Sequence, residues 1–227
     1  MNETSPEGKK DNFKIAEVEM SLLKPTVLVT GFEPFGGDSI NPSFETVKRL
    51  PDRIGSSDII KAELPVVFGA APDRLLSLID EYSPSAVLCT GLAGGRRAIT
   101  PEVIAVNLRH ARIPDISGKQ PVWEKIDDLG PDGIFATLPV REMTAAMKEA
   151  WIPAELSFSA GTFVCNEVMY RLLAAQRKHF PEKPAGFVHV PFAEEFPHDE
   201  AFSMPLEDIV KGLNLCAEII DRRLSHK

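Results

Sequence analysis

Short apolar runs alternate with stretches of helical periodicity along most of this chain, and this alternation limits the folds open to it. The apolar runs are typical of short, mostly buried strands and cover residues 27–29, 59–64, 86–89, 104–108 and 187–190. The helical patterns cover residues 41–50, 72–82, 140–150, 166–179 and 206–224. Strands alternating with helices predict parallel βαβ units. We therefore expect a single α/β domain, a three-layer α/β/α sandwich with a mostly parallel central sheet.

Two stretches stand outside this alternation. Residues 1–25 are mostly polar and are expected to form an appendage, which leaves residues 26–227 as the folded domain. Residues 113–133 are rich in proline and glycine. A long irregular loop in a compact domain is commonly functional or mobile, so this one is a candidate lid or oligomer contact.

The charge balance of this 227-residue chain limits the classes of partner that it is expected to bind. It carries 25 Lys and Arg against 33 Asp and Glu, a formal charge of −8, with a pI near 5.2. This balance argues against a nucleic-acid partner. No apolar run reaches the length of about 18 residues that a membrane span needs, and the first 25 residues lack an apolar signal core. We expect a cytoplasmic protein with no membrane association.

Two glycine-rich segments follow predicted strands, at the sheet edge where α/β proteins bind ligands. They are GFEPFGG (residues 31–37) and GLAGGRRAITPE (residues 91–102). Neither contains G-x-G-x-x-G or G-x-x-x-x-G-K-[ST], so neither predicts a nucleotide site. Phe32 and Phe35 suit a flat, weakly polar ligand better than a phosphate. The alternative is a strand-to-helix turn whose phenylalanines belong to the core.

The three cysteines differ in their sequence context. Their odd number and wide spacing favour neither a disulfide framework nor a zinc site. Cys216 lies beside the apolar stripe of the last predicted helix and is expected to pack in the core. Cys165 falls in the first turn of a predicted helix, where backbone amides and the helix dipole favour a thiolate. Cys165 is therefore the candidate nucleophile.

A thiol nucleophile needs a proton carrier and a group that orients it. His189, at the end of a predicted strand, is the best placed of five histidines, although spacing alone leaves His110 open. The other three, His179, His198 and His226, fit a solvated surface. Glu102, at the end of its glycine-rich segment, is the candidate carboxylate.

The sequence resembles the pyroglutamyl peptidase I family of cysteine exopeptidases, also called pyrrolidone-carboxylate peptidases. The resemblance covers nearly everything from residue 26 to the C-terminal helix and excludes residues 1–25. It rests on several motifs in the family's order: VLVTGFEPFGGDSINPS (27–43), GGRRAITPE (94–102), ARIPD (111–115), TLPV (137–140), SAGTFVCN (159–166), MY (169–170) and FVHVP (187–191).

This resemblance implies a hydrolase that removes an amino-terminal pyroglutamyl residue from peptides without metal or cofactor. It implies that Cys165 attacks the pyroglutamyl carbonyl, that His189 protonates the leaving amine and that Glu102 orients His189. Arg112 matches a family arginine near the developing oxyanion, with a surface salt bridge as the alternative. The positions that match the family's grip on the lactam ring are Phe32, Phe35, Ile113, Phe163 and Val164. Asn41 matches an asparagine that hydrogen-bonds near the ring, and it also fits a helix N-cap.

The chain departs from the family pattern near the expected pocket. Leu92 stands where the family commonly has glutamine, and Val66 stands where it commonly has threonine. If the lost side chains bind the lactam, each loss weakens binding by about 1 kcal/mol. The other departures spare the triad and are His110, Ile116 and Glu167.

These departures keep other functions open beside the pyroglutamyl peptidase. One alternative is a related cysteine hydrolase that prefers another blocked amino-terminal group, and another is a non-catalytic relative that binds peptide ends. A phosphorylase-like enzyme on a similar fold lacks an evident basic phosphate cradle. The resemblance also implies small peptide substrates and a homo-oligomer, a tetramer by analogy with the family.

Overall fold

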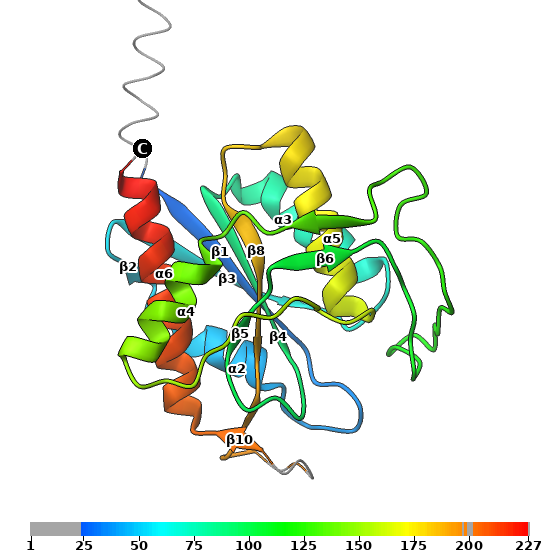
Figure 1. Ribbon diagram of the computed structural model, residues 1–227, viewed down its shortest axis with the longest axis horizontal. Coiled ribbons are helices and arrows are strands. Elements are labelled where there is room, and N and C mark those ends of the chain that lie inside the picture. Colours follow the sequence, from blue (N-terminus) through cyan, green and yellow to red (C-terminus); the bar gives the residue numbers. More distant parts are fainter. Residues whose placement is uncertain (1–23, 197, 199–201, 227) are drawn as a thin grey trace, which may run out of the picture.

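A computed structural model describes residues 24–196, 198 and 202–226 (Figure 1). Its helices are α2 (Pro42–Arg49), α3 (Ala70–Tyr82), α4 (Val140–Glu149), α5 (Val164–His179) and α6 (Leu206–Ser225). Its longer strands are β1 (Thr26–Phe32), β3 (Ser57–Leu64), β4 (Ala86–Leu92) and β8 (Ala185–Val190). Its short strands are β2 (Arg53–Ile54), β5 (Thr100–Pro101), β6 (Ile104–Val106), β7 (Gly133–Phe135), β9 (Phe192–Ala193) and β10 (Ser203–Met204).

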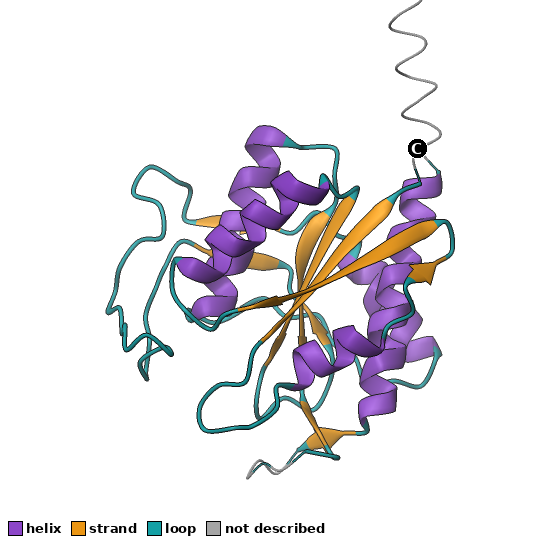
Figure 2. Cartoon of the chain, turned by 180° about the vertical axis from the view of Figure 1, so that it is seen from behind, coloured by secondary structure: helices purple, strands orange, loops and turns teal. Residues whose placement is uncertain are grey.

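The central sheet has the strand order β2-β3-β1-β4-β8-β5. Its four long strands run parallel, and the two short edge strands β2 and β5 are antiparallel to their neighbours. Helices α2, α4 and α6 cover one face and helices α3 and α5 cover the other (Figures 1 and 2). The predicted three-layer α/β sandwich with a mostly parallel sheet is confirmed.

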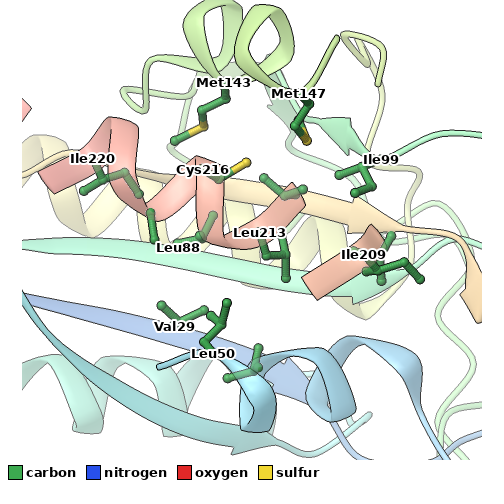
Figure 3. Packing of buried hydrophobic residues seen from close by; sticks show 14 of the residues in the cluster. Val29, Leu50, Leu88, Ile99, Met143, Met147, Ile209, Leu213, Cys216 and Ile220 are labelled. Carbon is green, nitrogen blue, oxygen red and sulfur yellow. The ribbon is translucent and has the colours of Figure 1, made fainter. Parts of the chain in front are cut away.

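The strands alternate their side chains between two hydrophobic cores. In β1, Val27 and Val29 face the core under α2, α4 and α6, whereas Leu28 faces the core under α3 and α5. Cys216 of α6 is buried in the first of these cores beside Met143 and Leu213 (Figure 3). The expectation that Cys216 packs in the core is confirmed.

The prediction for residues 104–108 is wrong in part. Only residues 104–106 form a strand, β6, and it does not join the central sheet. It pairs with β7, which the sequence patterns did not predict, in a separate antiparallel ladder. The connection between β6 and β7 extends away from the body of the molecule (Figure 1). It contains the predicted irregular loop except for its last residue, Gly133, which begins β7, and we call residues 107–132 the arm.

The boundary predicted at residue 25 falls next to the part of the chain that is not described. Residues 1–23 lie outside the described residues, so the predicted appendage stays a prediction. Pro25 already belongs to the fold, because its carbonyl accepts a hydrogen bond from the Asp58 amide at 2.9 Å. Among the described helices, none is long and apolar enough to cross a membrane.

Candidate active site

The carboxyl ends of β4 and β8 bring two candidate groups together. In the parallel ladder of these strands, Gly91 is the register partner of His189. A methyl group on Gly91 would lie 2.9 Å from the Cys165 sulfur and 2.8 Å from the Phe187 ring. The thiol therefore lies directly against the backbone of the strand that neighbours His189, and only a glycine leaves room for it.

Glu102 and His189 form a buried pair. The Nδ1 atom of His189 lies 2.7 Å from Oε1 of Glu102, and both side chains are almost fully buried. Glu102 is fixed by its backbone, because its amide donates to the Phe187 carbonyl at 2.9 Å. An ionised carboxylate can only accept, so Nδ1 carries the proton and Nε2 keeps its lone pair.

Arg96 is a charged residue of the site to which the sequence patterns assigned no role. Its guanidinium donates to the same Oε1 atom of Glu102 at 2.7 Å and to the Ser159 carbonyl at 3.0 Å. It also bonds the Thr100 hydroxyl. One feature of the sequence could have pointed to Arg96, which is its place in the segment GGRRAITPE, six residues before Glu102.

The charges around the pair set its protonation. Burial, the largest influence on Glu102, raises the pKa of its carboxyl, but His189, Ser157 and Arg96 together outweigh it and the pKa lies below its usual value. Burial, the largest influence on His189, lowers the pKa of its imidazole. Arg96 lowers this pKa further, whereas Glu102 raises it. Near neutral pH the site therefore holds a carboxylate and a neutral imidazole.

The surroundings of Cys165 act on the pKa of its thiol in opposite directions. Cys165 is the second residue of α5, as predicted, and its backbone amide favours the thiolate. Burial and the negative charge of Glu102 outweigh this effect and raise the pKa of the thiol to about 12. The Cys165 residue is half-buried, and its raised pKa favours a neutral thiol over a thiolate in the free protein.

A cavity of about 470 Å³ lies beside the residues that lead into α5, the helix that carries Cys165. Four predicted site residues line it, Phe35, Arg112, Ile113 and Phe163, and they are joined by His110, Gly161 and Thr162. The rings of Phe35 and Phe163 lie 5.5 Å apart. Arg112 is exposed and has no hydrogen bond or ion pair with another described residue, so its guanidinium is open to a ligand.

The remaining predicted site residues do not line this cavity. Phe32 is in the core, 6.4 Å from the Phe187 ring, and Val164 is fully buried. Asn41 caps α2 by accepting from the Ser43 amide at 3.0 Å, and its side-chain NH₂ donates to the Glu33 carbonyl at 2.9 Å. The N-cap interpretation is confirmed.

The two unusual residues of the expected pocket occupy different places. Leu92 is the half-buried last residue of β4. Val66 is buried, and its backbone joins two loops, because its amide donates to the Glu33 carboxylate at 2.9 Å and its carbonyl accepts from the Ile116 amide at 3.2 Å. Their contribution to ligand binding stays a prediction.

Within the described ranges, no group of three or more His, Cys, Asp and Glu side chains could hold a metal ion. The chemistry that the site offers is that of its own side chains. They are a thiol at a helix start, an imidazole with a free Nε2 atom and a buried carboxylate behind it.

Comparison with known proteins gives one consistent result. A family described as pyroglutamyl peptidase matches residues 25–223. The pyrrolidone-carboxylate peptidase of Streptococcus suis is 47% identical over 191 residues, covering 83% of this chain and 89% of the relative. That of Lactobacillus johnsonii is 44% identical over 199 residues, covering 87% and 93%.

Solved structures agree with the sequence relatives. The crystal structure of pyroglutamyl peptidase I from Bacillus amyloliquefaciens superimposes with a TM-score of 0.84 at 40% identity, covering 87% of this chain and 97% of that one. Pyrrolidone carboxyl peptidase from Thermococcus litoralis gives a TM-score of 0.85 at 38% identity, covering 89% and 96%.

Proposed function

The chain belongs to the pyroglutamyl peptidase family, and on this premise we propose that it hydrolyses the bond after an amino-terminal pyroglutamyl (5-oxoprolyl) residue of peptides through the triad Cys165, His189 and Glu102. The observation that supports this triad most is the buried 2.7 Å contact between Nδ1 of His189 and Oε1 of Glu102. His189 belongs to β8, and the neighbouring strand β4 carries Gly91, against which the Cys165 thiol lies. A non-catalytic peptide binder has no need for this arrangement.

The reaction begins from a neutral pair. As the Cys165 sulfur attacks the pyroglutamyl carbonyl carbon, the thiol proton passes to Nε2 of His189. The tetrahedral intermediate collapses, the carbon–nitrogen bond breaks and His189 gives the proton to the leaving amine. Water then attacks the thioester with His189 as the base, which releases pyroglutamic acid and restores the thiol.

Charge that develops in this cycle is balanced by two groups. Glu102 stabilises the imidazolium that forms when His189 takes the proton. Arg112, whose guanidinium has no partner among the described side chains, stabilises the oxyanion together with the backbone amide of Cys165. The chemistry calls for no metal or cofactor.

The substrate ring binds in the cavity described above. Phe35, Phe163 and Ile113 provide apolar walls that suit a flat lactam. Phe32 and Val164 belong to the core against which Phe35 and Phe163 pack, and Asn41 holds the Glu33 carbonyl directly after β1. Leu92 and Val66 lack polar side chains, so lactam recognition there relies on backbone groups.

The experiment compares two peptides that differ only in the first residue, pyroglutamate or proline, whose ring lacks the lactam oxygen. We expect the full chain to release the first residue of the pyroglutamyl peptide only, in a reaction blocked by iodoacetamide and unaffected by a chelator. Cleavage of other blocked amino termini in preference to pyroglutamate would favour the related hydrolase with altered specificity. Binding without cleavage would favour the non-catalytic relative.

The setting of this activity follows the family resemblance. We propose that the protein acts in the cytoplasm as a homo-oligomer, a tetramer by analogy with the family. Its three cysteines are free, which suits a reducing compartment. Its substrates are small peptides, and the acidic charge balance disfavours nucleic acid.

A further inference from the structure

Arg96 links three segments of the proposed active site. It belongs to the loop after β4, and it holds Glu102, which follows β5, at 2.7 Å. Its second nitrogen holds the Ser159 carbonyl at 3.0 Å, in the segment that leads into α5 and Cys165. Arg96 thus spans the site from the carboxylate to the segment that carries the nucleophile.

Arg96 belongs to a different cavity from the one proposed for the lactam ring. It does not line the cavity that holds Phe35 and Phe163. Instead it lines a different surface cavity of about 550 Å³ together with Arg97 and Ser157. An effect of Arg96 on the reaction must therefore pass through Glu102 or the α5 segment, not through contact with the ring.

We propose that Arg96 is a positioning residue that balances the charge of Glu102 and thereby keeps His189 able to accept the thiol proton. Glu102 favours the imidazolium form of His189, which cannot act as a base, whereas burial and Arg96 favour the neutral imidazole. Because Arg96 and His189 share one oxygen of Glu102, the guanidinium offsets part of the carboxylate's charge. This role rests on the proposed function of the triad.

Two other titratable residues close to Cys165 in the chain or the sheet, Cys89 and Glu167, do not offset the charge of Glu102. Cys89 of β4 is a buried neutral thiol, since burial raises its pKa to about 12. Glu167 of α5 is neutralised by its ion pair with Arg109. The charged groups that act on His189 and Cys165 are therefore Glu102 and Arg96.

The test compares Arg96→Gln, Arg96→Lys and, as a matched control, Arg97→Gln, whose guanidinium lies 3.6 Å from the Phe202 ring centroid. For Arg96→Gln we expect kcat to fall about tenfold with KM unchanged. The acid limb of kcat/KM should move up by roughly one pH unit, because His189 loses a positive neighbour. Arg96→Lys should keep the limb near the wild-type position.

A second readout needs no substrate. Alkylation of Cys165 by iodoacetamide at pH 9 should slow in Arg96→Gln and stay unchanged in Arg97→Gln. Superimposable pH profiles and equal alkylation rates would overturn the role of Arg96. Absence of turnover in the wild type would instead refute the proposed function, and the alkylation comparison would still decide the role of Arg96.

A different observation concerns the arm. Trp123 is 77% exposed, yet its backbone has φ of +55°, a strained conformation for a bulky side chain. Reciprocal hydrogen bonds between Arg109 and Glu124, at 2.7 and 3.0 Å, hold this part of the arm in place. The Trp123 ring meets that of His110 edge to face at 6.1 Å, and His110 lines the ring cavity.

The pair adjoins the cavity proposed for the lactam ring, because His110 lines that cavity. A pyroglutamyl residue is cyclic and amino-terminal, so no residue precedes it. Any wall that contacts substrate beyond the ring therefore contacts the residues on the far side of the scissile bond. We infer that Trp123 and His110 form a subsite that favours an aromatic residue directly after pyroglutamate, since aromatic rings pack favourably edge to face.

The test measures kcat/KM for pyroglutamyl-phenylalanine amide and pyroglutamyl-alanine amide. We expect a preference for phenylalanine of roughly three- to tenfold, and we expect Trp123→Ala and His110→Ala each to bring the ratio of the two kcat/KM values close to one. Trp151→Ala is the matched control, because Trp151 is an exposed tryptophan with φ of +62° at the end of α4. A wild-type ratio near one, or a ratio that survives both substitutions, would refute the subsite. Failure to cleave either amide would refute the proposed function itself.

Discussion

At the residue scale, the closeness of Gly91 to the thiol is the sharpest geometric constraint. Gly91→Ala would place a methyl group 2.9 Å from the Cys165 sulfur and 2.8 Å from the Phe187 ring. We expect kcat/KM to fall about 100-fold while the protein still folds, because a displacement near 1 Å misaligns the nucleophile. Gly186→Ala is the control, since its added methyl meets the flexible Leu138 side chain at 3.0 Å. Equal activity of the two variants would contradict the position of the thiol.

The protonation of Cys165 makes a second prediction at this scale. Because burial and Glu102 raise the pKa of the thiol to about 12, its alkylation by iodoacetamide should be slow at pH 7 and keep rising past pH 9. The pKa of His189 lies below the usual value for histidine, so its imidazole should stay neutral down to a lower pH. The acid limb of kcat/KM, which reports this pKa, should therefore also lie below the usual pKa of histidine. An alkylation rate that levels off between pH 5 and 7 would indicate a resting thiolate instead.

The individual residues show what sequence patterns could provide. Cys165 begins a helix, His189 lies near the end of a strand and Glu102 follows one, so their positions could be predicted from the chain. The protonation of Cys165 could not, because the helix start is visible in the sequence while the burial is not. Arg96 was missed because only the fold brings its guanidinium to Glu102 and Ser159.

At the scale of elements, Asp221 joins the last helix to the sheet edge. Its carboxylate accepts from the Ser56 amide at 3.0 Å and from the hydroxyls of Ser56 and Ser57 at 2.8 and 2.7 Å. We expect Asp221→Ala to lower the free energy of unfolding by about 2 kcal/mol, because the buried Ser57 hydroxyl and the two donors of Ser56 lose their acceptor. Arg223→Ala, which breaks an exposed ion pair with Glu142, should cost less than about 1 kcal/mol. Urea denaturation measures both, and equal losses would contradict this role of Asp221.

The elements themselves were largely predictable. All five predicted helices are present, because a helical stripe over a core is visible in local sequence. The strand β6 was placed in the wrong sheet, since its apolar run reveals burial but not its partner. Its partner β7 is only three residues long and follows a loop, so it leaves little periodicity to detect.

At the scale of the whole molecule, the exposed apolar side chains are unevenly distributed. Among the described residues, nine large hydrophobic side chains are exposed, and six of them lie between residues 113 and 135. They are Ile113, Ile116, Val122, Trp123, Leu129 and Phe135. Ile113 and Trp123 are assigned above to the substrate, and the concentration of the other four marks an interaction surface that agrees with the proposed homo-oligomer.

We therefore predict a solution mass above the 25.0 kDa of one chain. Leu129→Glu, which charges a side chain that is 98% exposed on the arm, should shift the protein towards the monomer. Trp151→Glu, at a side chain that is 94% exposed outside the arm, should leave the mass unchanged. Light scattering during gel filtration measures all three proteins. A monomeric wild type would contradict the prediction.

The measurement that tests the central claim most directly is release of a fluorogenic amine from its L-pyroglutamyl amide under reducing conditions. The wild type is compared with Cys165→Ala and with Cys216→Ala. The second variant removes a thiol that is buried in the core under α2, α4 and α6. The triad predicts turnover by the wild type and by Cys216→Ala, and none by Cys165→Ala. Turnover that survives in folded Cys165→Ala, or no turnover by folded wild type, would contradict it.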